Sequence, residues 1–223
     1  MPFLGHILCN VGVKIFAATM GYEKVFEKLK HEIIWLDIKP ETMIALTEVA
    51  ERFGVSRTPI KEALVHLYAE GWIIRQGSHF ISSPLTLDLI RDLTEIRSFM
   101  EIQAYIWAMH RISHQENEKL EAIVQELGAL DEGTPNRNII EIDLKFHQTL
   151  YQATGNNQLS IYLERILCHF IRFWLSGNRQ IHPEIFFKET RAIIKAINEK
   201  DEISLRAATI GHVKSSLDEI MGH

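Results

Sequence analysis

Apolar residues recur at helical spacing along almost the whole chain, and one short stretch interrupts the pattern. In residues 72–81, two apolar runs flank a polar turn with Gly77 at its centre. Two apolar runs joined by a glycine-containing turn are typical of a small β-hairpin. The chain is therefore predicted to be mainly α, with one hairpin between a short N-terminal group of helices and a longer helical part.

Three helices are predicted before the hairpin. The first covers residues 22–36, where apolar residues stand three or four positions apart. The second follows Thr47 and ends at Gly54, because glycine readily adopts the left-handed conformation that ends a helix. The third begins around Ser56–Thr58 and is closed by Gly71.

The chain after the hairpin is predicted to be helical throughout. Ser82-Ser83-Pro84 is interpreted as a linker. The chain is thus divided into an uncertain N-terminal extension (1–20), a first domain (21–83) and an all-α six-helix bundle domain (84–223). The six predicted helices cover about 86–110, 114–131, 137–154, 157–178, 183–199 and 202–220.

Composition places the chain among ordinary globular proteins. Of its 223 residues, 46% are hydrophobic and 24% are charged, close to average usage. No run of 18 residues is both apolar and free of charge, so neither a membrane-spanning helix nor a membrane partner is expected. Two cysteines, Cys9 and Cys168, are too few for a disulfide framework, which favours the cytoplasm. A net charge of −5 excludes bulk electrostatic coating of nucleic acid, but leaves room for a local basic surface.

Residues 1–20 are apolar but make a poor signal peptide. No positive cluster precedes the apolar part, and Lys14 interrupts it. Three interpretations stay open: a frayed extra helix, a tail that binds a partner, or sequence upstream of a start at Met20. No function is assigned to this segment.

The three short helices and the hairpin have the layout of a winged helix-turn-helix. In such a module the second helix of the pair enters the major groove and reads bases with its N-terminal residues. That end carries Ser56, Arg57, Thr58 and Lys61, with Arg57 and Lys61 four residues apart on one face. Arg57 can form a bidentate contact with guanine, whereas Thr58 is better suited to a phosphate.

The tip of the hairpin supplies a second candidate DNA contact. Gly77 would let Ser78 and His79 approach the DNA backbone or the minor groove. Against this, residues 22–83 hold eight Lys or Arg and nine Asp or Glu, so the module is near neutral. A scaffold or a protein-binding surface is the alternative that this balance leaves open.

The segment VAERFGVSRTPIKEALVHLYAEGWI (49–73) closely resembles the signature of the GntR family of bacterial transcription regulators. The resemblance extends from Tyr22 to about Ile81. It implies that Arg57, Thr58 and Lys61 contact DNA and that Gly77 lies in the wing. Lysine stands at position 61 where arginine is usual, and it lacks the planar fork of arginine, so a phosphate contact is expected there rather than a base contact.

The helical domain contains one informative polar pair inside an apolar stripe. Asp143 and His147 stand four residues apart on the face that also carries Ile140 and Leu150. A carboxylate and an imidazole at this spacing can chelate a divalent metal. An exposed helix edge and a simple Asp–His hydrogen bond are the alternatives.

The six-helix organisation, the RSFME segment (97–101), the segment that contains Asp143 and His147, and the closing His212 resemble the FCD domain of FadR-type GntR regulators. The resemblance implies a metal site of Asp143, His147 and His212, and a small carboxylate effector near it. The remaining histidine of the family pattern falls at Thr190, whose hydroxyl is a poor ligand. Either three ligands hold Zn²⁺, Mn²⁺ or Ni²⁺, or the two histidines hold a carboxylate in a metal-free pocket.

Two arginines are candidate effector contacts beside Thr190. Arg97 matches an arginine that binds effector in several relatives of this type. A buried arginine needs an anionic partner, which for Arg97 is either a ligand or a protein carboxylate such as Glu101. Arg172 has apolar neighbours on both sides and is the weaker candidate.

The function predicted from the sequence is a homodimeric, DNA-binding repressor of transcription that reads a palindromic operator and responds to a small organic acid. Two other classes are retained. One is a metal-dependent hydrolase that uses Asp143, His147 and His212, although no recognised hydrolase motif accompanies them. The other is a helical interaction module whose N-terminal domain does not bind DNA.

Overall fold

The computed structural model describes residues 20–177 and 179–221. The interpretations offered for the extension before Met20 fall outside the described residues. Contacts divide the chain into two compact units, of which the first ends at Thr86 and the second begins at Leu87.

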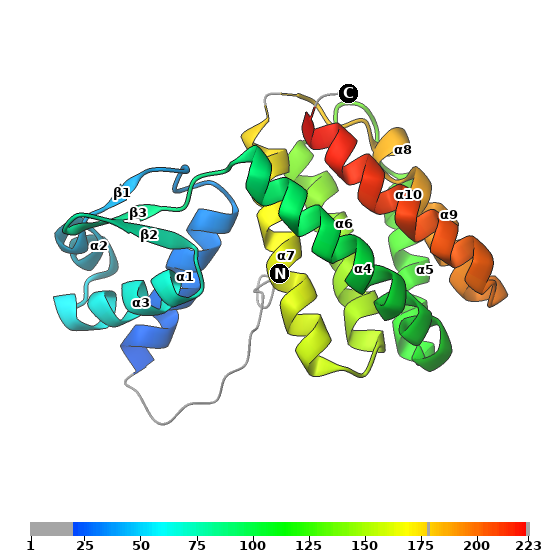
Figure 1. The fold of residues 1–223 in the computed structure, drawn as a ribbon, viewed down its shortest axis with the longest axis horizontal. Coiled ribbons are helices and arrows are strands. Elements are labelled where there is room, and N and C mark those ends of the chain that lie inside the picture. The colour runs from blue at the N-terminus through cyan, green and yellow to red at the C-terminus, as the bar shows by residue number, and fades with distance from the viewer. Residues whose placement is uncertain (1–19, 178, 222–223) are drawn as a thin grey trace. The chain divides into compact units, whose positions relative to one another are not determined.

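The first unit contains three helices and a small sheet among its described residues (Figure 1). Gly54 ends the second helix with φ +64°, the left-handed conformation expected of it. The elements are α1 (Met20–Ile34), β1 (Met43–Ile44), α2 (Leu46–Phe53), α3 (Arg57–Ala69), β2 (Ile73–Gln76) and β3 (His79–Ser82).

The sheet has one strand more than the predicted hairpin. β2 and β3 form the hairpin, and β1 pairs antiparallel with the other edge of β3, so that Met43 stands opposite Ile81. A two-residue strand cannot show the alternation of apolar and polar residues by which strands are recognised in a sequence. The fold prediction of a mainly α chain with a winged helix-turn-helix is otherwise confirmed.

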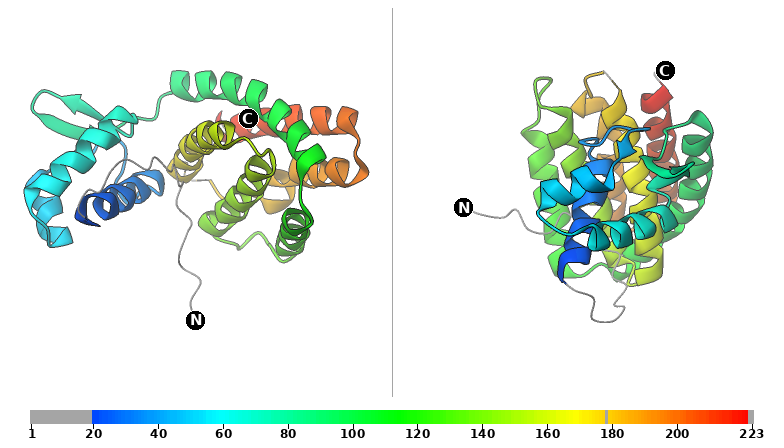
Figure 2. Two further views of the ribbon diagram at one scale, coloured as in Figure 1. Left: turned by 90° about the horizontal axis from the view of Figure 1, so that it is seen from below. Right: turned by 90° about the vertical axis from the view of Figure 1, so that its left-hand side faces the viewer.

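The apolar face of α3 anchors the first unit. Ile60, Ala63, Leu64 and Leu67 are all completely buried, and α3 packs along α1 (Figure 2). Because one face of α3 is fully occupied by the core, its opposite face is left for solvent.

The second unit is a bundle of helices. Its α4 packs against α6, α7 and α10, while α9 packs against α10 (Figure 1). The three neighbours of α4 therefore bring side chains from distant parts of the sequence to one core. The helices are α4 (Leu87–Arg111), α5 (His114–Gly128), α6 (Asn136–Ala153), α7 (Asn157–Ser176), α8 (Pro183–Phe186), α9 (Lys188–Glu199) and α10 (Glu202–Met221).

The single helix predicted for residues 183–199 was wrong, because the structure divides it into α8 and α9. The division falls at Phe187, whose backbone (φ −99°, ψ 14°) leaves the helical region. The Phe187 side chain is completely buried. Burial of this ring, and not a glycine or proline, accompanies the break, so no local signal in the sequence marked it.

Among the described residues, no helix is both long and apolar enough to cross a membrane.

Truncation of Leu64 should destabilise the first unit through the core. Leu64→Ala is expected to cost about 2–5 kcal/mol, because it removes buried methyl groups and leaves a cavity. Val65→Ala is the matched control, since Val65 is 51% exposed on the same helix, and it should change stability by less than about 0.5 kcal/mol. Hydrogen exchange of the α3 amides measures both. Equal protection in the two variants would contradict this account of the anchor.

Candidate functional site

The N-terminal end of α3 is open to solvent. Ser56 precedes the helix in an extended conformation, and α3 begins at Arg57. Ser56, Arg57, Thr58 and Lys61 are all exposed, and within the described part of the chain neither Arg57 nor Lys61 forms an ion pair. A helix start with free N–H groups and two unpaired cations is suited to an anionic backbone.

The tip of the hairpin is exposed as well. Gly77 has φ +60°, which few other residues adopt without strain, and Ser78 and His79 lie at the surface beside it. Arg75 on β2 is also exposed, and its Nε donates a hydrogen bond of 3.1 Å to the Gly77 carbonyl. Arg75 is a cation of this tip that the sequence reasoning did not single out.

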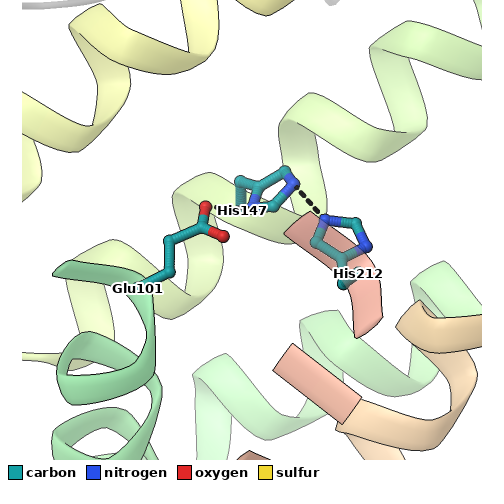
Figure 3. Close-up of side chains that lie close together, drawn as sticks. All are labelled: Glu101, His147 and His212. Atoms are coloured by element: carbon teal, nitrogen blue, oxygen red, sulfur yellow. Dashed lines mark hydrogen bonds and ion pairs between the residues drawn. The ribbon is translucent and has the colours of Figure 1, made fainter. Parts of the chain in front are cut away.

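A cluster of buried polar side chains lies in the second unit, where α4, α6 and α10 meet. Glu101 of α4, His147 of α6 and His212 of α10 point toward one another (Figure 3). One ligand atom of each lies within 4.8 Å of the other two. We call these three residues, together with Asp143 and Arg97, the α4–α6–α10 cluster.

His147 lies close to each of the other two predicted metal ligands. The Nε2 atoms of His147 and His212 are 3.1 Å apart, and Asp143 Oδ2 is 3.5 Å from His147 Nε2. Neither oxygen of the buried Asp143 carboxylate has a hydrogen-bond partner among the described residues. Thr190 of α9 is completely buried, and its hydroxyl also lacks a hydrogen-bond partner among the described residues.

Glu101 is the member that the sequence reasoning did not place among the ligands. The sequence predicts it only as a partner for Arg97, and that ion pair is present, with 3.0 Å between Arg97 Nε and Glu101 Oε1. Tyr151 donates its hydroxyl hydrogen to the same carboxylate oxygen. The signal available in the sequence was the spacing of four between Arg97 and Glu101, which puts both on one face of α4.

The outer end of Arg97 reaches both imidazoles. Its Nη2 lies 3.1 Å from His147 Nε2 and 3.1 Å from His212 Nε2. Because a guanidinium only donates, both Nε2 atoms must act as acceptors. Nδ1 of His147 then carries the hydrogen, which it donates to the Tyr105 hydroxyl oxygen at 2.6 Å. This tautomer leaves on Nε2 the lone pair that a metal ligand needs.

Burial sets the protonation states of the cluster. It lowers the pKa of His147 to about 3, although Glu101 opposes the shift, and it lowers the pKa of His212 well below its ordinary value. Burial raises the pKa of Asp143 to about 6, against the influence of His212 and Arg97. Burial is the largest single influence on Arg97 and disfavours its charge, but Glu101, Tyr151 and Tyr105 together more than offset this, so the pKa of Arg97 is raised. The cluster thus combines neutral imidazoles with charged Arg97.

The donor set fits a divalent cation in its composition and spacing. Two nitrogens bound to tetrahedral zinc at about 2.0–2.1 Å stand roughly 3.3–3.4 Å apart, close to the 3.1 Å between the two Nε2 atoms. The Asp143 carboxylate, whose buried oxygens lack partners, supplies a negative ligand beside them. A cation held there would also relieve the cost of burying that carboxylate.

A cavity of about 200 Å³ adjoins His212. Two carboxylates and no arginine or lysine occur among its described lining residues, so its potential favours cations over anions. The lining residues are Ile185, Phe186, His212, Ser215, Ser216, Asp218 and Glu219.

Arg172 is completely buried on α7, where burial lowers its pKa to about 10. Phe170 on the same helix is completely buried too, and the guanidinium carbon of Arg97 lies 4.5 Å from the centre of its ring. The aromatic side chains of α7 thus serve the core around the cluster.

Comparison with known proteins gives a match in each unit. Residues 21–79 match the bacterial regulatory proteins of the gntR family, and residues 92–215 match the FCD domain. The second match covers more than half of the chain.

Several curated proteins resemble the chain over most of its length. An uncharacterized HTH-type transcriptional regulator of Bacillus subtilis, YdhC, is 27% identical and aligns over 93% of this chain and 94% of its own. The Nta operon transcriptional regulator of Aminobacter aminovorans is 26% identical and aligns over 82% of this chain and 86% of its own. The HTH-type transcriptional repressor RspR of Escherichia coli is 23% identical, over 89% and 88%.

Solved structures share the fold. The structure of E. coli McbR/YncC superposes with a TM-score of 0.80 at 19% identity, covering 92% of this chain and 99% of the other. That of a regulator named GntR from Rhodococcus sp. RHA1 gives 0.69 at 15% identity, over 92% and 99%. At such identities the likeness concerns the fold alone.

The Asp143 carboxylate should destabilise the metal-free chain above about pH 6. Its pKa is about 6 in the folded chain against an ordinary value of 3.8. As the pH rises from 4 to 6, the unfolded chain loses this proton first, so folding is penalised by up to about 3 kcal/mol. Asp143→Asn is therefore expected to be more stable than the parent chain at pH 7.5, and the difference should shrink toward pH 4.

Urea unfolding in the presence of a chelator measures this difference. Asp88→Asn is the control for loss of one carboxylate, because the Asp88 side chain is 80% exposed, and it should change little at either pH. An Asp143→Asn chain that is less stable than the parent at pH 7.5 would mean that the carboxylate is favourably paired.

Proposed function

The chain belongs to the gntR family of bacterial regulatory proteins and carries an FCD domain, and from this premise we propose a homodimeric repressor that reads a palindromic operator through α3 and the hairpin tip. It is a DNA-binding transcription regulator, and its FCD domain is of the effector-binding type. The hydrolase alternative is set aside, since both family matches and the named relatives are regulators. Its place of action is the cytoplasm, where the bacterial chromosome lies.

The observation that carries the proposed DNA contact is the exposed, unpaired Arg57 in the first turn of α3, a helix whose apolar residues are buried. Arg57 reads a base edge, and the first N–H groups of the helix bind phosphate with Ser56 and Thr58. Lys61, one turn further on, neutralises a phosphate. At the wing, Gly77, Ser78 and His79 contact the DNA backbone or the minor groove.

The proposal of a dimer follows from the small size of one reading head. A single helix-turn-helix reads only a few base pairs, whereas two-fold dimers read palindromes with half-sites about one turn apart. The second unit offers apolar surface for such a contact: Phe99 is 83% exposed on α4 and Ile96, one turn earlier, is 48% exposed. Exposed apolar side chains one turn apart favour an interface.

The proposed effector is a small organic acid held in the α4–α6–α10 cluster, with Arg97 as its cationic contact. A divalent metal, Zn²⁺, Mn²⁺ or Ni²⁺, is proposed to be held there by Asp143, His147 and His212, with Glu101 as a further carboxylate. When bound, the metal supplies positive charge for a carboxylate. The cavity beside the cluster has an acidic lining, which does not attract an anion. Binding of an organic acid therefore depends on Arg97 and the metal. Thr190 and Arg172 are the remaining candidate contacts.

Removal of the Arg57 side chain should weaken specific DNA binding and relax sequence preference. We expect Arg57→Ala to lower affinity for a selected duplex about 5- to 150-fold, the equivalent of about 1–3 kcal/mol for one bidentate base contact. Lys61→Ala should instead weaken specific and random duplexes alike, and reduce the slope of log affinity against log salt by about 1.

Fluorescence anisotropy with duplexes selected from a random pool measures both variants. Arg206→Ala is the matched control, since Arg206 is a half-exposed arginine of α10 paired with Glu202, so it loses the same charge away from α3. Retention of the selected duplex by Arg57→Ala at the level of the control would count against α3 as the reading helix.

Protein purified without a chelator is expected to carry less than one equivalent of metal per chain, because Thr190 replaces one histidine of the family pattern. Elemental analysis measures it, and a chelator should remove it. Adding Zn²⁺, Mn²⁺ or Ni²⁺ should raise the melting temperature of the chain but not that of His147→Ala. His114→Ala, at a histidine that is 90% exposed, should still respond. Absence of metal together with absence of any thermal shift would remove the metal from this proposal.

A further inference from the structure

The Arg97 guanidinium binds the same two nitrogens that a metal would use. Its Nη2 is 3.1 Å from the Nε2 atoms of both His147 and His212, and these two Nε2 atoms are themselves 3.1 Å apart. Two neutral imidazoles with lone pairs directed at each other at this distance repel, unless a donor or a cation lies against both. In the metal-free chain, Arg97 provides that cation.

We propose that Arg97 is an internal competitor of the divalent metal, so that metal binds only when the guanidinium leaves the two histidines. The inference rests on the proposed metal site and adds the condition under which that site binds a metal. Each Nε2 has one lone pair in the plane of its ring, and that lone pair either accepts from Nη2 or binds the metal. The two states therefore exclude each other.

Charge reinforces the exclusion. Arg97 keeps its positive charge, because Glu101 lies 3.0 Å from its Nε. A divalent ion placed beside a guanidinium in a fully buried site, with Arg97, His147 and Glu101 all at zero exposure, is repelled strongly because little solvent screens the pair. Movement of Arg97 away from the histidines removes both the competition for lone pairs and this repulsion.

Other polar atoms of the cluster are available to bind a metal and an anion. Both oxygens of Asp143 and the second oxygen of Glu101 lack hydrogen-bond partners among the described residues, as does Nη1 of Arg97. The carboxylate oxygens are negative ligands that Arg97 leaves unused. Nη1 and a released Nη2 are donors that an anion can accept from, so metal and organic acid are expected to favour each other's binding.

The test is the metal affinity of a chain that lacks this guanidinium. Arg97→Met keeps the length of the side chain and removes its charge. It is expected to bind Zn²⁺ at least tenfold more tightly than the parent chain, in competition with a chromophoric chelator at pH 7.5. Arg111→Met is the matched control, because Arg111 lies on the same helix, about 21 Å further along it, and loses the same charge. It should match the parent within about twofold.

The outcomes separate this inference from the metal site itself. Equal or weaker zinc affinity of Arg97→Met beside a parent chain that binds zinc overturns the competition and leaves the site standing. No zinc binding by either chain overturns both. Loss of binding in His147→Ala, with tight binding in Arg97→Met, places the ion on the histidines and supports the proposal.

A second measurement uses the parent chain, so it does not depend on how Arg97→Met folds. An Nη2 group that donates to two acceptors rotates slowly, so NMR spectra of the arginine side chains should show resolved Nη–H signals for Arg97 in the chelator-treated protein. One equivalent of Zn²⁺ is expected to abolish or displace them. Resolved signals that stay unchanged in zinc-loaded protein would overturn the proposal.

Discussion

The second unit depends on one physical interaction: two buried imidazole nitrogens 3.1 Å apart both lie within hydrogen-bond distance of the same guanidinium nitrogen. Burial keeps both rings neutral, so the cation has to come from elsewhere. Arg97 supplies it and is itself held by Glu101. Because these residues come from α4, α6 and α10, the same contacts tie three helices of the bundle together.

The proposed site is built from groups that would otherwise weaken the core. Buried carboxylates without partners cost stability, and Asp143 keeps both its oxygens unpaired among the described residues. A domain that responds to a ligand needs a site at which a change in charge on binding alters the packing of several helices. The cluster meets this requirement, since a change at its centre is felt by α4, α6 and α10 at once.

The first unit is proposed to present a few residues of α3 to DNA. Its α3 buries one face completely and exposes the other, so the core fixes the orientation of the cationic end. Residues 22–83 are nearly neutral as a whole. Recognition of DNA therefore depends on a few individual residues and not on the net charge of the domain. Regulation then requires only a modest coupling between the ligand and DNA sites, of about 1–3 kcal/mol in typical cases.

Local patterns were sufficient for most elements of the fold. Helical periodicity, the left-handed stop at Gly54 and the glycine at the hairpin tip each act within a few residues, and the structure has a helix end or a turn at each. The third strand and the break at Phe187 were missed, because pairing with β3 and burial of one ring depend on residues distant in the sequence.

The sequence by itself determined the two families, the helix that carries Arg57, and the position of Asp143 and His147 on an apolar helix face, since each follows from a motif or from the spacing along one helix. Only the tertiary structure decided that Glu101 joins the histidines and that Arg97 donates to both of them. His147 and His212 are 65 residues apart along the chain, and no periodicity within a helix reports which side chain of a neighbouring helix will fill the space between them.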